Sequence, residues 1–210
     1  MPLVRENSQL YEVIKVGTVS GVPILTSISG VTIVSGTVPV SDNNSSFTVD
    51  GKAYRTTATI TRPSNTTAYT AGDVVGDTGG SAIISLTAAG PTAGFVIIQS
   101  ISLVFSNSTV PSGMGAFRLH LFSTSPTAIA DNDPFDLTSA DRATYMGYVD
   151  FPAPQDLGSS IYTQTDYPGR LIKLAAASTT LYAELETRGA HTPVSASTVS
   201  IRVNLLEAGL

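Results

Sequence analysis

The chain contains no cysteine and no tryptophan, and only 13% of its 210 residues are charged. Without cysteine it can form no disulfide, thiolate nucleophile or cysteine-ligated metal site, which fits maturation in a reducing compartment. There is no basic cluster, and 11 Lys and Arg stand against 16 Asp and Glu, a formal net charge of −5. We therefore expect neither nucleic acid nor an anionic membrane surface as a partner.

Long apolar runs are also missing, as is the pattern of an export signal. The longest apolar stretches, such as Gly94-Phe-Val-Ile-Ile, end within a few residues, whereas a membrane-spanning helix needs about 20. Glu6 and Glu12 stand where a secretory signal would carry basic and then apolar residues. The sequence predicts neither a membrane span nor secretion by a signal peptide.

Residues that favour helices (Lys, Glu and Leu) are scarce, while Ser, Thr and Val are abundant, a balance typical of an all-β protein. Short alternating segments between turn residues predict strands near 52–62, 67–75, 81–87, 94–106, 115–123, 145–151, 160–165, 169–175, 179–188 and 197–206. They indicate a two-sheet β-sandwich: a Greek-key jelly roll first, an immunoglobulin-like sandwich as the alternative. The long connection 124–145 suits a jelly-roll crossover, within which Thr138 or Ser139 could cap one helical turn.

The composition and pattern of the chain change near residue 50, which divides it into an N-terminal segment, residues 1–50, and a predicted jelly-roll-like domain, residues 51–210. Within the first segment, the Gly-punctuated tract 16–40 has high β-propensity and no charged residue, and Pro23 and Pro39 would each interrupt a central strand ladder. An exposed apolar tract favours pairing with another surface. We expect an extended, β-rich arm that contacts other molecules, the alternative being strands of one globular fold. The candidate arm residues are Val16, Val19, Val22, Ile24, Val31, Ile33, Val38 and Val40.

Two local patterns within the predicted sandwich are distinctive. Asp50-Gly51 lies between two β-prone segments and predicts a type I′ hairpin turn. Farther on, the apolar residues of Phe117–Phe122 alternate with Arg118 and His120. This alternation predicts a strand with one buried face and one partly wet face.

Few residues form catalytic or metal-binding patterns, and we assign none to catalysis, a metal or a cofactor. Asp77-Thr-Gly matches the catalytic turn of aspartic proteases, but that mechanism needs two such loops and the chain has one, so an ordinary turn is expected. The acidic loop Asp131–Asp136 lacks EF-hand spacing; we interpret it as a solvated turn, with a bound cation as the alternative. His120 and His191 are too few for a multi-histidine zinc site.

Aromatic residues in the second half of the chain provide a binding alternative. Exposed tyrosines on a β-sandwich can stack on sugars, and Tyr162 and Tyr167 are the candidate surface-contact aromatics. Packing within the core or at interfaces is the main interpretation of the other tyrosines.

Two tracts resemble segments of known proteins. Ile33-Val-Ser-Gly-Thr-Val-Pro-Val-Ser-Asp-Asn-Asn-Ser-Ser-Phe-Thr-Val-Asp-Gly51 resembles tracts of structural proteins encoded by tailed bacteriophages and prophages. Arg62-Pro-Ser-Asn-Thr-Thr-Ala-Tyr-Thr-Ala-Gly-Asp-Val-Val-Gly-Asp77 is similar to a segment that opens the β domain of such proteins. Neither tract carries a motif from which binding residues could be transferred.

The resemblance implies a non-enzymatic virion component with a jelly-roll-like body. The expected role is a capsid decoration (cement) protein that binds the major capsid protein on the outside of the shell, often as a homotrimer, after assembly in the host cytoplasm. The alternative is a phage tail, fibre or surface module that binds carbohydrate. An acidic, charge-poor chain with no phosphate-binding loop is compatible with both.

Overall fold

The computed structural model describes residues 3–6, 9–12, 18–19, 22–23 and 52–208. The chain divides into two compact units, Met1–Thr48 and Val49–Leu210. In the first unit, β1 (Leu3–Glu6) pairs antiparallel with β2 (Gln9–Glu12), and β3 (Thr18–Val19) with β4 (Val22–Pro23). Among the described residues, no helix is long and apolar enough to span a membrane.

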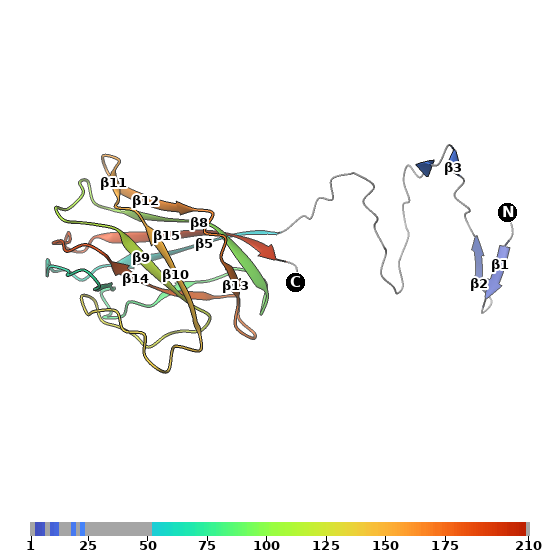
Figure 1. Cartoon of the computed structure of the whole chain (residues 1–210), viewed down its shortest axis with the longest axis horizontal. Coiled ribbons are helices and arrows are strands. Elements are labelled where there is room, and N and C mark those ends of the chain that lie inside the picture. The colour runs from blue at the N-terminus through green and yellow to red at the C-terminus, as the bar shows by residue number, and fades with distance from the viewer. Residues whose placement is uncertain (1–2, 7–8, 13–17, 20–21, 24–51, 209–210) are drawn as a thin grey trace. The chain divides into compact units, whose positions relative to one another are not determined.

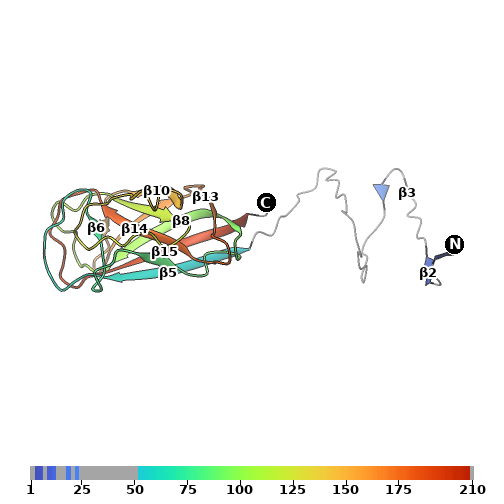
Figure 2. The same cartoon turned by 90° about the horizontal axis from the view of Figure 1, so that it is seen from below.

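The second unit is a sandwich of two antiparallel sheets (Figures 1 and 2). The first sheet is built from β11 (Gln155–Asp156), β12 (Ile161–Asp166), β8 (Phe95–Phe105), β15 (Thr198–Ala208) and β5 (Ala53–Thr61) in that order, with β13 (Leu171–Lys173) also on β8. The second sheet is built from β10 (Tyr145–Phe151), β9 (Phe117–Phe122), β14 (Leu181–Thr187) and β6 (Val74–Val75), with β7 (Ile84–Leu86) also on β14. The all-β prediction is confirmed.

The order of the strands is that of a jelly roll. β6 and β7 share one position beside β14, and β12 and β13 share one beside β8. The strands of the sandwich pair from the two ends of the chain toward its middle, the first strand with the last and the second with the second-last. The pairs are β5 with β15, β6 and β7 with β14, β8 with β12 and β13, and β9 with β10. A long hairpin folded over itself in this way gives two Greek keys and two sheets. Its turn is the 123–144 connection. The crossover predicted there is wrong, because β9 and β10 pair directly in one sheet and the connection is a long hairpin loop.

Side chains that alternate along the long strands form the core between the sheets. In β15, Val199, Ile201, Val203 and Leu205 are all buried, as period-two alternation requires. β8 breaks this alternation, because its register with β15 shifts between Asn204 and Leu205. A bulge of this kind lets Ile98 and Ile101 both face inward although they are three residues apart.

The predicted strands agree with the structure except at a few positions. The predicted strand 67–75 is reduced to Val74–Val75, because Tyr69 and Asp73 form isolated bridges to the loops, with His191 and Pro134 respectively. The possible helical turn near Thr138 is a non-helical turn. Asp50-Gly51 lies outside the described residues.

The long 123–144 connection returns along the edge of the second sheet. Val74 N–H donates to Asp133 O (2.9 Å), Asn132 N–H donates to Val74 O (3.0 Å) and Ala82 N–H donates to Ile129 O (2.9 Å). The connection therefore extends the sheet beyond β6. From there its side chains reach the outer face of β14 and β9.

Candidate functional site

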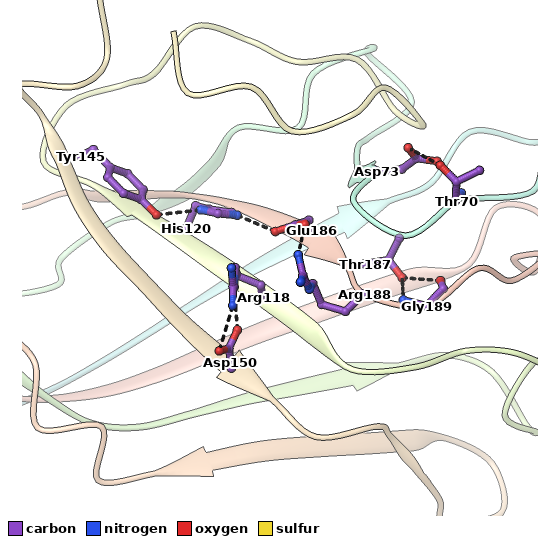
Figure 3. A network of polar contacts seen from close by, with 10 residues as sticks. All are labelled: Thr70, Asp73, Arg118, His120, Tyr145, Asp150, Glu186, Thr187, Arg188 and Gly189. Carbon is purple, nitrogen blue, oxygen red and sulfur yellow. Dashed lines mark hydrogen bonds and ion pairs between the residues drawn. The ribbon is translucent and has the colours of Figure 1, made fainter. Parts of the chain in front are cut away.

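Several ionisable side chains of the sandwich gather on the outer face of the second sheet. In β9 and β14 the odd-numbered residues point into the core, so the even-numbered ones point outward. The register aligns Asp150, Arg118 and Glu186 in one row across β10, β9 and β14. The residues joined there, which we name the outer-face cluster, are Arg118, His120, Tyr145, Asp150, Glu186 and Arg188 (Figure 3).

At the centre of the outer-face cluster lies His120. Its Nε2 is 2.8 Å from Glu186 Oε2, and its Nδ1 is 3.0 Å from the Tyr145 hydroxyl (Figure 3). Glu186 Oε1 accepts a bond of 2.7 Å from Arg188 Nη1. Both oxygens of this carboxylate and both nitrogens of the imidazole are thus engaged with other side chains. The arrangement joins β9, β10 and β14.

His120 was predicted on a partly wet face, and that prediction is wrong. Its side chain is 5% exposed, because Phe135 from the 123–144 connection stacks on the ring with the centroids 3.5 Å apart. Burial lowers the pKa of His120, while the hydrogen bond to Glu186 acts in the opposite direction. Burial also raises the pKa of Tyr145. The neutral imidazole is the form this environment favours.

Beside this centre the outer-face cluster includes a more exposed ion pair. Arg118 binds Asp150 with both carboxylate oxygens engaged, at 2.7 and 3.1 Å, and its guanidinium lies 3.6 Å from the centroid of the Tyr148 ring. This geometry combines a bidentate pair with a cation–π contact. The hydrogen bonds that Arg118 donates to Asp150 raise the pKa of Arg118.

The next outward residue on β14 is a buried acid. Glu184 is 1% exposed, and its Oε1 has no hydrogen-bond partner among the described residues. Burial, and next the charge of Asp141, raise the pKa of Glu184 to about 7. Asp141 accepts bonds from the Thr138 hydroxyl (2.6 Å) and the Thr127 N–H (3.1 Å), and the Thr138 bond is the main cause of its lowered pKa. Of the two acids, Glu184 therefore retains its proton to a higher pH.

A second polar network, which we name the loop lock, joins Arg62, Tyr69 and Asp131. Arg62 Nη2 lies 3.0 Å from Asp131 Oδ2, and Arg62 Nε donates to the Tyr69 hydroxyl at 2.5 Å. That hydroxyl donates to Asp131 Oδ1 at 2.5 Å, and the Gly76 N–H donates to the same oxygen at 2.9 Å. Burial raises the pKa of Tyr69. The loop lock ties the segment after β5 to the 123–144 connection.

His191, the second histidine, extends the loop lock to the β14–β15 loop. Its carbonyl accepts from the Tyr69 N–H at 2.9 Å, and its ring lies 5.3 Å from the Tyr69 ring. Burial lowers the pKa of His191. The two histidines belong to separate networks, each with a packing role.

The structure shows the contacts of two motifs, Asp77-Thr-Gly and the acidic loop 131–136, for which the sequence allowed more than one interpretation. The Asp77 carboxylate accepts from the N–H groups of Gly79 (2.8 Å) and Ser81 (3.2 Å), so Asp77 closes its own turn, as predicted. The acidic loop 131–136 was interpreted as a solvated turn, and for Asp131 this is wrong: its side chain is 7% exposed and paired with Arg62. Within residues 52–208, no three His, Asp or Glu side chains are grouped as a metal site would need.

The predicted contact aromatics lie on and beside β12. Tyr162 is half-buried and lines a surface groove, and Tyr167 is 80% exposed in the connection to β13. Of the candidate arm residues, Val19 and Val22 pair with each other in β3 and β4. The other six, Val16, Ile24, Val31, Ile33, Val38 and Val40, lie outside the described residues.

Replacing Phe135 with alanine is expected to expose the His120 ring to water. The pKa of His120 should rise, and the free energy of unfolding should fall by about 1–2 kcal/mol through loss of the stack and of buried area. Titration of the histidine ring protons by NMR measures the first effect, and His191 serves as the internal control. An unchanged pKa at His120 would contradict the shielding role of Phe135.

No protein-family model matches this chain, and no curated protein sequence matches it significantly. The class rests on the fold and the site: a jelly-roll β-sandwich whose buried polar side chains bind one another and fasten the loops to the sheets.

Proposed function

We propose that the protein is a non-enzymatic virion structural protein, a capsid decoration protein that binds and stabilises a major capsid lattice as a symmetric oligomer. The resemblance described above favours a homotrimer. The observation that carries the proposal is a contrast within the chain. Residues 53–208 supply every strand position of a jelly roll, whereas residues 16–41 contain no charged residue and are rich in Val and Ile. An uncharged β-prone tract outside a complete fold suits strand addition to neighbours.

The outer-face cluster and the loop lock support the same proposal. A protein that stabilises a capsid lattice needs a rigid body. Both networks hold loops in place through hydrogen bonds and ion pairs between buried polar groups. His120 lies between Tyr145 and Glu186, but Phe135 covers its ring and leaves it 5% exposed, so a substrate has little access to it. The net charge of −5 favours the outer capsid surface over contact with packaged DNA.

The first test is the absolute mass in solution of the full chain and of a chain that begins at Gly51. We expect the full chain at three times 21.7 kDa and the shortened chain as a monomer with the circular dichroism of a β-sandwich. Light scattering after size-exclusion chromatography measures both masses. A monomeric full chain would contradict self-assembly through the arm.

Point variants of the full chain test the arm more sharply. Ile33→Asp places a charge within the uncharged tract and is expected to dissociate the oligomer, because burying an unpaired carboxylate is costly. Ser41→Asp, at the end of the same tract, is the matched control and should leave the mass unchanged. The capsid role itself is tested by mass spectrometry and immunogold labelling of purified phage particles: label on the heads supports it, and label confined to tails contradicts it.

A further inference from the structure

The groove beside β12 combines the groups that bind a sugar. It has a volume of about 390 Å³ and is lined by Pro152, Ala153, Gln155, Tyr162, Thr163, Gln164 and Asp166. Tyr162 supplies a phenol ring, an apolar surface with a polar tip. Gln155 lies directly opposite Tyr162 in the β11–β12 pair. An aromatic ring beside amides and a carboxylate matches the alternating apolar and hydroxyl-bearing faces of a pyranose.

The polar groups of this groove are positioned before any ligand arrives. Tyr162, Gln164 and Asp166 point to the same side of β12, because successive side chains alternate. The Tyr162 hydroxyl donates to Gln164 Oε1, and Gln164 Nε2 donates to Asp166 Oδ2 at 2.8 Å. A carboxylate has about four acceptor positions, so Asp166 can accept sugar hydroxyls in addition to this bond.

The opposite wall of the groove is also fixed. The Thr163 hydroxyl donates to the Pro152 carbonyl at 2.7 Å, and the Thr165 hydroxyl donates to the Asp150 carbonyl at 2.5 Å. The first bond holds the segment after β10 against β12, and the second holds the end of β10 itself against β12. A preformed site avoids much of the ordering cost of binding, which matters for ligands as weakly bound as sugars.

The sheet face next to the groove continues this polar surface. The register places Ser102 beside Gln164 and Ser100 beside Asp166, with Asn204 next to Ser100. Asn204 Nδ2 donates to Ser100 Oγ at 2.8 Å. Strands are about 4.8 Å apart, so hydroxyl and amide groups extend from the groove across the face. These groups could bind the further residues of an oligosaccharide seated in the groove.

We propose that this groove binds a neutral oligosaccharide, with Tyr162 as the stacking surface and Gln164 and Asp166 as the hydroxyl-binding groups. Neutral sugars are favoured because no lining residue is basic and Asp166 carries a carboxylate. All residues that line the groove belong to the second unit, so this inference can be tested independently of the proposed assembly.

The test is titration calorimetry of the full chain with maltotetraose, cellotetraose, mannotetraose and β-1,4-galactotetraose. We expect at least one of them to bind with Kd below about 1 mM. Tyr162→Ala should weaken that binding at least tenfold and Gln164→Ala severalfold, while Tyr162→Phe, which keeps the ring, should retain most of it. Tyr148→Ala is the matched control: it removes a tyrosine, 41% exposed, from the other sheet and should leave binding unchanged.

Two outcomes would overturn the proposal. The first is no binding of any of the four sugars at about 10 mM, and the second is binding that persists undiminished in Gln164→Ala and Tyr162→Ala. If Tyr162→Ala does not fold, the decision rests on Gln164→Ala, whose side chain is exposed on β12 and is not part of the core.

Discussion

Replacing Arg62 with alanine is expected to lower the free energy of unfolding by about 3–5 kcal/mol, the usual effect of removing one partner of a buried ion pair. The side chains of Arg62 and Asp131 are only 3% and 7% exposed. Without the guanidinium, Asp131 would keep its bonds from Tyr69 and Gly76 but lose its countercharge. The chain has no tryptophan, so urea unfolding followed by circular dichroism or tyrosine fluorescence is the suitable measurement.

Two further variants isolate the cause. Arg55→Ala removes an exposed arginine from β5 and should change the stability by about 0.5 kcal/mol or less. Adding Asp131→Asn to Arg62→Ala should cost less than the sum of the two single changes, because the pair is coupled. A loss below about 1 kcal/mol for Arg62→Ala would contradict a buried, uncompensated Asp131.

Glu184→Gln is expected to stabilise the protein at alkaline pH and to have little effect at acid pH. The pKa of Glu184 is raised from 4.5 to about 7 in the folded chain, mainly by burial. Between these values the folded state binds more protons than the unfolded state, so the contribution of Glu184 is present below pH 4.5 and is lost as the pH rises through 7. The shift corresponds to about 3 kcal/mol. Glutamine stays neutral throughout and avoids that loss.

The measurement is the difference in unfolding free energy between Glu184→Gln and the natural chain at pH 4.5 and at pH 8. His120 and His191, whose pKa values are lowered, contribute the opposite slope: their buried neutral rings cost stability as the pH falls below about 6.5. These histidine contributions occur in both proteins and cancel in the difference. A difference that does not change with pH would show that Glu184 is hydrated in the folded state.

Local pattern was sufficient to place most of the strands. Segments such as Ser197–Leu205 combine β-branched residues with strict alternation, so propensity and burial favour the same structure. The short stretch around Tyr69 also has strand-forming residues, but there Tyr69 is used in the loop lock. The ladder therefore begins only at Val74.

The polar networks were harder to anticipate. Glu184 and Glu186 both occupy even-numbered positions of β14, whose side chains point to the outer face of the sheet. Alternation along the strand therefore predicts that both side chains are exposed to water. Their burial depends on a connection more than forty residues earlier in the chain, which covers that face with Phe135 and the Asp141 turn. The pairing of Arg62 with Asp131 spans 69 positions, and no local pattern encodes such a separation.

By itself the sequence determined the fold class, most of the strand positions and the Asp77 turn, because these follow from side-chain periodicity and from backbone preferences of neighbouring residues. Only the tertiary structure decided which outward-facing residues meet water. The position of a residue along a strand determines which face of the sheet its side chain points to. Whether that side chain meets water depends on whether a loop covers that face. For His120, Glu184 and Glu186 that loop is the 123–144 connection, and its cover lowers the pKa of His120 and raises that of Glu184.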